Sequence, residues 1–226
     1  MVSVNVDEVI LLLKEKSNPI HLAGMKRFGI ENSMALGIPI PELRKLARVI
    51  KRDHPLALAL WETSFHEARI LATMVADPAS VTEEQFDKWV SGFNSWDICD
   101  QTCGNLLDRT PFAIDKAIAY SAREEEFVKR AGFVLMAEYA IHNKAANDAV
   151  FIDFFQIIER EACDNRNFVK KAVNWALRQI GKRNELLRLY AIETAHRILM
   201  KDCKAARWVA SNALNELKGK APVTLN

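Results

Sequence analysis

Two side chains one helical turn apart have the chemistry to stabilise a positive charge that develops during a reaction. They are Trp96 and Asp100, in the segment Asn94-Ser-Trp-Asp-Ile-Cys-Asp100. If a helix starts here, positions i and i+4 share one face, and Cys103 follows on the same face. A carboxylate beside an indole suits a cationic transition state, because both groups attract positive charge. The alternative is a tryptophan at the edge of the core whose neighbouring aspartate pairs with an arginine.

The residues between this pair have simpler roles. Ser95 is placed to cap the helix by accepting a backbone amide hydrogen bond. Asp97 lies in the first turn, where a carboxylate complements the positive end of the helix dipole. We therefore assign Asp97 a structural role and Asp100 the chemical one.

A second candidate is the helix expected over residues 168–182. Lys171, Trp175, Arg178 and Lys182 recur at i, i+4, i+7 and i+11, opposite an apolar stripe. An indole among three cations on a solvent face suits a ligand made of phosphates and sugars. The alternative is that an adjacent helix covers Trp175 while the three cations extend past it to water.

Several other kinds of site are excluded by the residues present. The five histidines are dispersed without metal-ligand spacing, and no HExxH, GxSxG, GxGxxG or P-loop pattern occurs. The four cysteines, Cys99, Cys103, Cys163 and Cys203, are too scattered for a disulfide framework or a zinc site. We expect four free and mostly buried thiols, no metal and no cofactor.

The composition predicts a water-soluble globular chain. No stretch reaches the roughly 18 apolar residues of a membrane span, and the N-terminal sequence MVSVNVDEVI lacks the features of a signal peptide. We therefore expect a cytoplasmic protein with no membrane contact. The formal charge is only +2, but residues 164–226 hold 13 Lys and Arg against 5 Asp and Glu. Such a basic end indicates a polyanionic partner or, alternatively, a solvated surface that keeps the protein soluble.

An internal repeat indicates the fold that positions these residues. Phe127-Val-Lys-Arg-Ala131 recurs as Phe168-Val-Lys-Lys-Ala172, 41 residues later, and fainter copies start near Phe65 and Ser211. About a dozen helical segments separated by Gly, Pro, Asn and Asp breaks fit this period, which is typical of HEAT and armadillo repeats. With only 8 Gly and 7 Pro, a many-stranded sheet protein is excluded. We predict a single all-α domain over residues 1–226, an α-solenoid (superhelix) of HEAT-like two-helix repeats.

Three motifs, taken together, resemble a known family. Ser95-Trp96-Asp97-x-x-Asp100, Phe127-x-x-Arg130-Ala131 and Lys171-Ala172-x-x-Trp175-x-x-Arg178, in this order and spacing, are similar to motifs of the alkylpurine DNA glycosylase D family of HEAT-like-repeat proteins. The similarity covers about residues 20–215. Each motif alone is short, whereas three in register on one repeat are fairly specific.

The resemblance implies a function and a role for each residue. Members excise purines alkylated at N3 or N7 from double-stranded DNA, in repair of alkylation damage. Asp100 matches the catalytic carboxylate, and Trp96 and Trp175 match the two indoles that flank the deoxyribose. Arg130 and Arg178 match arginines that contact the DNA backbone. Lys171 and Lys182 join these as DNA-binding candidates because they share the face of Arg178, and we expect the protein to act as a monomer.

Two positions depart from the family pattern. Phe28 stands where members often have a tyrosine that contacts DNA, and Trp96 alone replaces a common Trp-Trp pair. Related paralogues bind DNA without excising bases. The competing hypothesis is therefore a HEAT-repeat module that binds DNA or a protein and performs no catalysis.

Overall fold

The computed structural model describes residues 5–30 and 33–219, and every regular element in these ranges is helical. Residues 1–4, which begin the stretch compared with a signal peptide, and Lys220 of the basic end lie outside them. The described chain forms two compact units, one up to Thr110 and one from Pro111 onward. The single domain over residues 1–226 stays a prediction.

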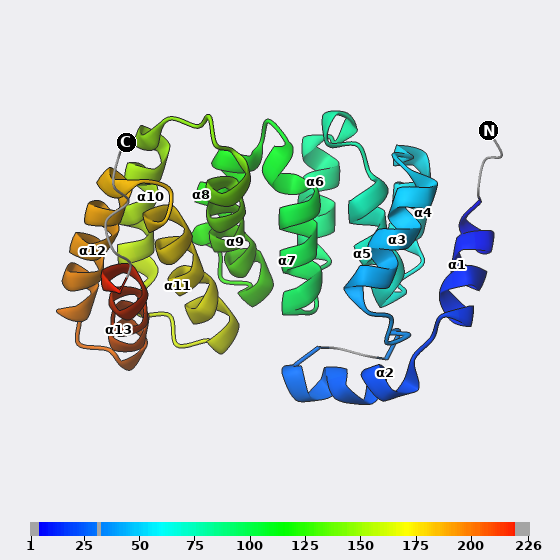
Figure 1. The fold of residues 1–226 in the computed structure, drawn as a ribbon, viewed down its shortest axis with the longest axis horizontal. Coiled ribbons are helices and arrows are strands. Elements are labelled where there is room, and N and C mark those ends of the chain that lie inside the picture. Colours follow the sequence, from blue (N-terminus) through cyan, green and yellow to red (C-terminus); the bar gives the residue numbers. More distant parts are fainter. Residues whose placement is uncertain (1–4, 31–32, 220–226) are drawn as a thin grey trace. The chain divides into compact units, whose positions relative to one another are not determined.

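The first unit holds seven short α-helices. They are α1 (Val6–Glu15), α2 (Pro19–Met25), α3 (Ile40–Ile50), α4 (His54–Glu62), α5 (His66–Val75), α6 (Glu83–Ser91) and α7 (Trp96–Asn105), with short 3₁₀ turns η1 (Lys26–Phe28), η2 (Pro78–Ser80) and η3 (Leu107–Arg109). Helix α5 is central, because it packs against α3, α4 and α7, while α2 runs crosswise to α5 and α7 (Figure 1). Trp61 of α4 and Trp89 of α6 stack with ring centroids 4.1 Å apart, which joins these two helices through the core.

The second unit holds six helices in two layers, and all of them except α8 are longer than the helices of the first unit (Figure 1). They are α8 (Ala113–Ser121), α9 (Glu126–His142), α10 (Asp148–Glu161), α11 (Asn167–Gly181), α12 (Glu185–Leu199) and α13 (Lys204–Lys218). Consecutive helices pair as α8 with α9, α10 with α11 and α12 with α13, and α11 also lies between α9 and α13. The unit is therefore a stack of helix pairs in which each pair covers the apolar face of the next.

The predicted patterning of α11 is confirmed. Every residue of its apolar stripe is fully buried, namely Val169, Ala172, Val173, Ala176 and Ile180. The expected breaks also fall between helices, and several carry caps: Asn184, for example, accepts the Leu187 amide at the start of α12. Local capping and helical periodicity thus explain most of the element boundaries.

The repeat spacing differs between the two units. In the second unit, the rings of Phe127 and Phe168 lie 5.6 Å apart, so positions 41 residues apart are spatial neighbours as predicted. In the first unit, the hydrogen bond between His66 and Asp97 spans 31 residues, as does that between His54 and Gln85. The first unit is built from shorter helices, and its repeat is correspondingly shorter.

The prediction of four free thiols is half wrong. Cys99 and Cys103 are buried and outside any disulfide, but Cys163 and Cys203 form a disulfide with Cα atoms 5.8 Å apart. Cys163 follows α10 and Cys203 precedes α13, 40 residues later, so the repeat period itself brings them together. Cysteines that are scattered in the sequence can therefore be neighbours in space, because a repeat fold stacks positions that lie one period apart.

Candidate functional site

Helix α7 carries the predicted pair of Trp96 and Asp100 on successive turns. Both side chains are partly exposed, whereas Cys103, one turn further, is fully buried. The indole Nε1–H of Trp96 donates to the carbonyl oxygen of Phe28 at 2.9 Å. This bond fixes the orientation of Trp96 against η1. This face of α7 therefore presents Trp96 and Asp100 toward the solvent and Cys103 to the core.

Phe28, the residue that departs from the family pattern, lies beside this pair. Its side chain is 69% exposed, and it follows Lys26 and Arg27, which are also exposed. An exposed ring next to two cations has the composition of a surface that contacts a nucleic-acid backbone. In the first unit, Trp96 is therefore anchored to a short basic and aromatic segment.

Asp97 is held in a hydrogen-bond network that its sequence context does not reveal. Its carboxylate contacts the Nε2 atom of His66 at 2.7 Å and accepts the hydroxyl of Ser95 at 2.7 Å. Ser95 precedes α7, but its side chain accepts no amide hydrogen bond, so the predicted cap by its side chain is wrong. The hydroxyl is used for Asp97 instead.

This network also sets the protonation of Asp97. Burial raises the pKa of the carboxyl, but the hydrogen bonds from His66 and Ser95 outweigh burial and hold the pKa below its ordinary value. Asp97 is therefore an ionised carboxylate that is hydrogen-bonded to His66. The structural role that we assign to Asp97 has a second basis besides the helix dipole. The hydrogen bond with His66 joins α7 to α5.

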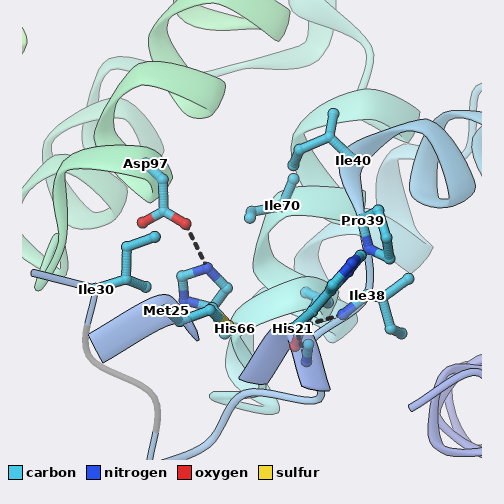
Figure 2. A pocket seen from close by; sticks show the side chains of 11 residues that line it. His21, Met25, Ile30, Ile38, Pro39, Ile40, His66, Ile70 and Asp97 are labelled. Carbon is cyan, nitrogen blue, oxygen red and sulfur yellow. Dashed lines mark hydrogen bonds and ion pairs between the residues drawn. The ribbon is translucent and has the colours of Figure 1, made fainter. Parts of the chain in front are cut away.

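A small pocket adjoins this pair (Figure 2). It has a volume of about 190 Å³, and apolar side chains dominate its walls. Its lining residues come from α2, the segment that leads from α2 to α3, the first residue of α3, α5 and α7: His21, Met25, Ile30, Gly37, Ile38, Pro39, Ile40, His66, Glu67, Ile70 and Asp97. No local motif predicts it, because residues that are far apart in the sequence assemble the lining.

Glu67 shapes one wall of the pocket. Its carboxylate accepts the backbone amides of Leu36, Gly37 and Ile38 at 2.8, 2.6 and 3.1 Å. Gly37 has φ of 76° and is packed against the backbone of α2, so a side chain there is excluded. The loop that leads into α3 is therefore fixed by one buried carboxylate.

The predicted DNA-binding residues of the second unit are in different environments. Arg130 of α9 is 5% exposed and donates from Nη1 to the carbonyl oxygen of Phe168 at 2.5 Å, which ties α9 to the start of α11. Arg178 and Lys182 are partly buried, and both form ion pairs with Glu216 of α13. Burial raises the pKa of Glu216, but these two cations outweigh it and hold the pKa low.

Lys171 and Trp175 complete the predicted set. Lys171 is exposed, and Trp175 is partly exposed. Both lie on α11 in the second unit, whereas Trp96 and Asp100 lie on α7 in the first. The joint action of the two tryptophans and the aspartate on one ligand therefore stays a prediction.

Among the residues that the structure describes, no three His, Cys, Asp or Glu side chains gather in a way that could hold a metal ion. In the same part of the chain, no helix has the length and apolar character needed to cross a bilayer.

Comparison with solved structures supports the fold. The chain superposes with a TM-score of 0.76 on a protein from a family related to the HEAT-like repeat DNA glycosylases with affinity for branched DNA structures. The match covers 98% of this chain and 99% of that one, at 19% sequence identity. The predicted fold class, an all-α solenoid of HEAT-like repeats, is thereby confirmed.

Comparison of sequences supports the family. The chain is 24% identical over 196 residues to an uncharacterized protein of Listeria innocua, and the match covers 85% of each chain. It is 23% identical over 140 residues to an uncharacterized protein of Listeria monocytogenes, covering 60% of this chain and 62% of that one. The family model described as DNA alkylation repair enzyme matches residues 9–217, nearly the whole chain, and the protein therefore belongs to this family.

Proposed function

We propose that the protein is a DNA glycosylase that excises cationic N3- or N7-alkylated purines from double-stranded DNA. The observation that carries this proposal is the Trp96 and Asp100 pair, partly exposed on successive turns of α7. The indole is anchored through its Nε1–H. Membership of the DNA alkylation repair enzyme family supports the same activity.

The chemistry required of the protein is small. Alkylation at N3 or N7 gives the purine a positive charge, so the base leaves with the electron pair of the C1′–N bond and becomes neutral. The sugar then carries the positive charge of an oxocarbenium-like transition state. A water molecule adds at C1′ and gives up a proton, which leaves an abasic site and a free base. No metal or cofactor enters these steps.

The residues of this chain have distinct roles in the proposed reaction. The Asp100 carboxylate stabilises the charge on the sugar and orients and deprotonates the water. Trp96 and Trp175 place indole faces against the deoxyribose, where cation–π attraction adds about 0.5–2 kcal/mol. Lys171, Arg178 and Lys182 serve as phosphate contacts, and Arg130 positions the start of α11.

The test is base release from alkylated duplex DNA under single-turnover conditions. Asp100→Asn is nearly isosteric, so we expect DNA affinity to persist while excision falls on the order of 10²-fold or more. Trp175→Ala should slow excision less. Asp153→Asn, which changes an exposed carboxylate of α10, is the matched control and should leave the rate unchanged. Equal excision by wild type and Asp100→Asn would overturn the assignment of Asp100.

A second candidate function is DNA binding without excision. It is favoured by the structural neighbour, whose family has affinity for branched DNA structures. Under this alternative, wild-type protein releases no base from alkylated duplex but binds a four-way junction more tightly than linear duplex. The same preparation can be used for both assays, so the two functions are separated directly.

A further inference from the structure

An exposed tryptophan of α13 lies outside the motifs that resemble the family. Trp208 is 40% exposed, and the Nζ atom of Lys170 from α11 sits 5.1 Å from the centre of its ring. The side-chain amide of Asn174 donates to the carbonyl oxygen of Val209 at 3.0 Å, which fixes α11 beside α13 at this level. Trp208 and the first turns of α11 therefore form one surface within the second unit.

The cations of this surface have no acidic partner. Lys171, Lys204 and Arg207 are exposed and Lys170 is partly exposed, and none of the four forms an ion pair with any residue that the structure describes. No described carboxylate neutralises these four cations through an ion pair, whereas Arg178 is paired with Glu216.

The surroundings contain few carboxylates, and the nearest in sequence to Lys204 is the exposed Asp202. Helix α11 has no Asp or Glu along its whole length. On α13, the exposed residues at helical spacing from Lys204 and Trp208 are Ser211, Asn212 and Asn215, which are polar and uncharged. Four cations without ion pairs outnumber this one carboxylate, and the other neighbours are polar and neutral, so the surface attracts a polyanion.

We propose that Trp208, with Lys170, Lys171, Lys204 and Arg207, forms a binding site for a single-stranded segment of DNA. This proposal rests on the proposed function, in which the protein binds DNA. It adds that this surface binds a single strand and not a duplex. In the interior of a duplex both faces of each base are already stacked, so an exposed indole finds no partner there. An unpaired base beside a gap, an end or a branch has an open face, on which Trp208 stacks while the cations bind flanking phosphates.

Alanine at position 208 is the direct test. Trp208→Ala should weaken binding of a single-stranded oligonucleotide on the order of 10-fold, measured by fluorescence anisotropy on the full-length protein. Binding of a blunt duplex of the same length should change far less. Trp208→Phe keeps an aromatic face and should restore most of the single-strand affinity, which separates stacking from loss of packing. Helical circular dichroism of each variant checks that the fold is intact.

The cations are tested by the salt dependence of binding. Changing Lys171 and Lys204 together to Gln should reduce the log-log salt slope for single-stranded DNA by roughly 0.7 per lost contact. Lys144→Gln is the matched control, because Lys144 is an exposed lysine of the same unit without an ion pair. Its slope should equal that of the wild type.

The outcomes are separable from those of the proposed glycosylase. Unmodified oligonucleotides need no excision, so single-strand binding succeeds or fails whether or not alkylated bases are released. If Trp208→Ala binds single strands as tightly as wild type, or loses single-strand and duplex binding equally, the stacking site is refuted. Loss of excision in Asp100→Asn leaves this test unaffected.

Discussion

The buried pair of Asp97 and His66 makes a specific prediction about stability. Asp97→Ala removes the acceptor of two hydrogen bonds, from His66 at 2.7 Å and from Ser95 at 2.7 Å. The side chains of His66 and Asp97 are 5% and 14% exposed, so the groups left behind are largely cut off from water. Each unpaired buried group costs about 1–3 kcal/mol.

The adjoining pocket moderates this cost. A volume of about 190 Å³ admits water, which can replace part of the lost hydrogen bonding. We therefore expect Asp97→Ala to lower the free energy of unfolding by about 2–4 kcal/mol. Asp97→Asn retains one acceptor and one donor, so its cost should be about 1–2 kcal/mol.

Urea unfolding at neutral pH, followed by circular dichroism, measures these changes. Glu15→Ala, which removes an exposed carboxylate at the end of α1 in the same unit, should change the free energy of unfolding by less than about 0.5 kcal/mol. If Asp97→Ala costs no more than Glu15→Ala, the hydrogen bonds to His66 and Ser95 contribute nothing and the reasoning fails.

The same pair predicts a dependence on pH. The folded state holds the pKa of Asp97 below its ordinary value of 3.8. The stabilisation is therefore fully present above that ordinary value and is lost as the pH falls through the lower pKa of the folded state. The difference in stability between wild type and Asp97→Asn should therefore narrow as the pH falls below about 4.

Three further predictions test packing, covalent linkage and charge. Gly132→Ala should lower the free energy of unfolding in urea by about 1–3 kcal/mol, because the new Cβ would lie 2.5 Å from the backbone of α8. Gly24→Ala is the control: its Cβ meets no atom within 4 Å, so this change should be neutral or stabilising. The disulfide between Cys163 and Cys203 closes a loop of 40 residues, so its reduction should lower the free energy of unfolding by about 4 kcal/mol. An unfolding midpoint that is the same with and without reductant would contradict this. Glu216→Gln removes the one carboxylate with which Arg178 and Lys182 pair, so duplex DNA should bind several-fold more tightly at low salt and with a steeper salt slope. An unchanged slope would mean that these cations do not reach phosphates.

The helices of the second unit could be predicted from the sequence because local rules and the repeat agree there. The apolar stripe that begins at Val169 is buried throughout, and residues Phe127 and Phe168, one period apart, pack together. The first unit follows the same local rules, but its neighbours along the stack are 31 residues apart rather than 41. A single period taken from the longer helices therefore could not pair His66 with Asp97.

The candidate site could be predicted only to the extent that it is local. The i, i+4 spacing of Trp96 and Asp100 predicts that they share one face of a helix, and in the structure both lie on α7. The bond from Trp96 to Phe28 spans 68 residues and has no signal in the sequence. Likewise, the helical spacing that places Lys171 and Arg178 on one face of α11 does not reveal their partners. Glu216 of α13 pairs with Arg178 and not with Lys171.

The distribution of ion pairs changes what the basic end of the chain can do. The excess of cations after residue 164 is a property of composition, but a polyanion responds to the charge that remains unpaired on one surface. Several of these arginines and lysines already have acidic partners: Arg166, Arg178, Lys182, Arg188 and Arg197. The unpaired cations concentrate instead where α11 and α13 begin, around the exposed ring of Trp208. A DNA strand that follows the strongest available charge in this unit therefore meets an aromatic face at the same place, and the site favours the part of the DNA in which a base is open to stacking.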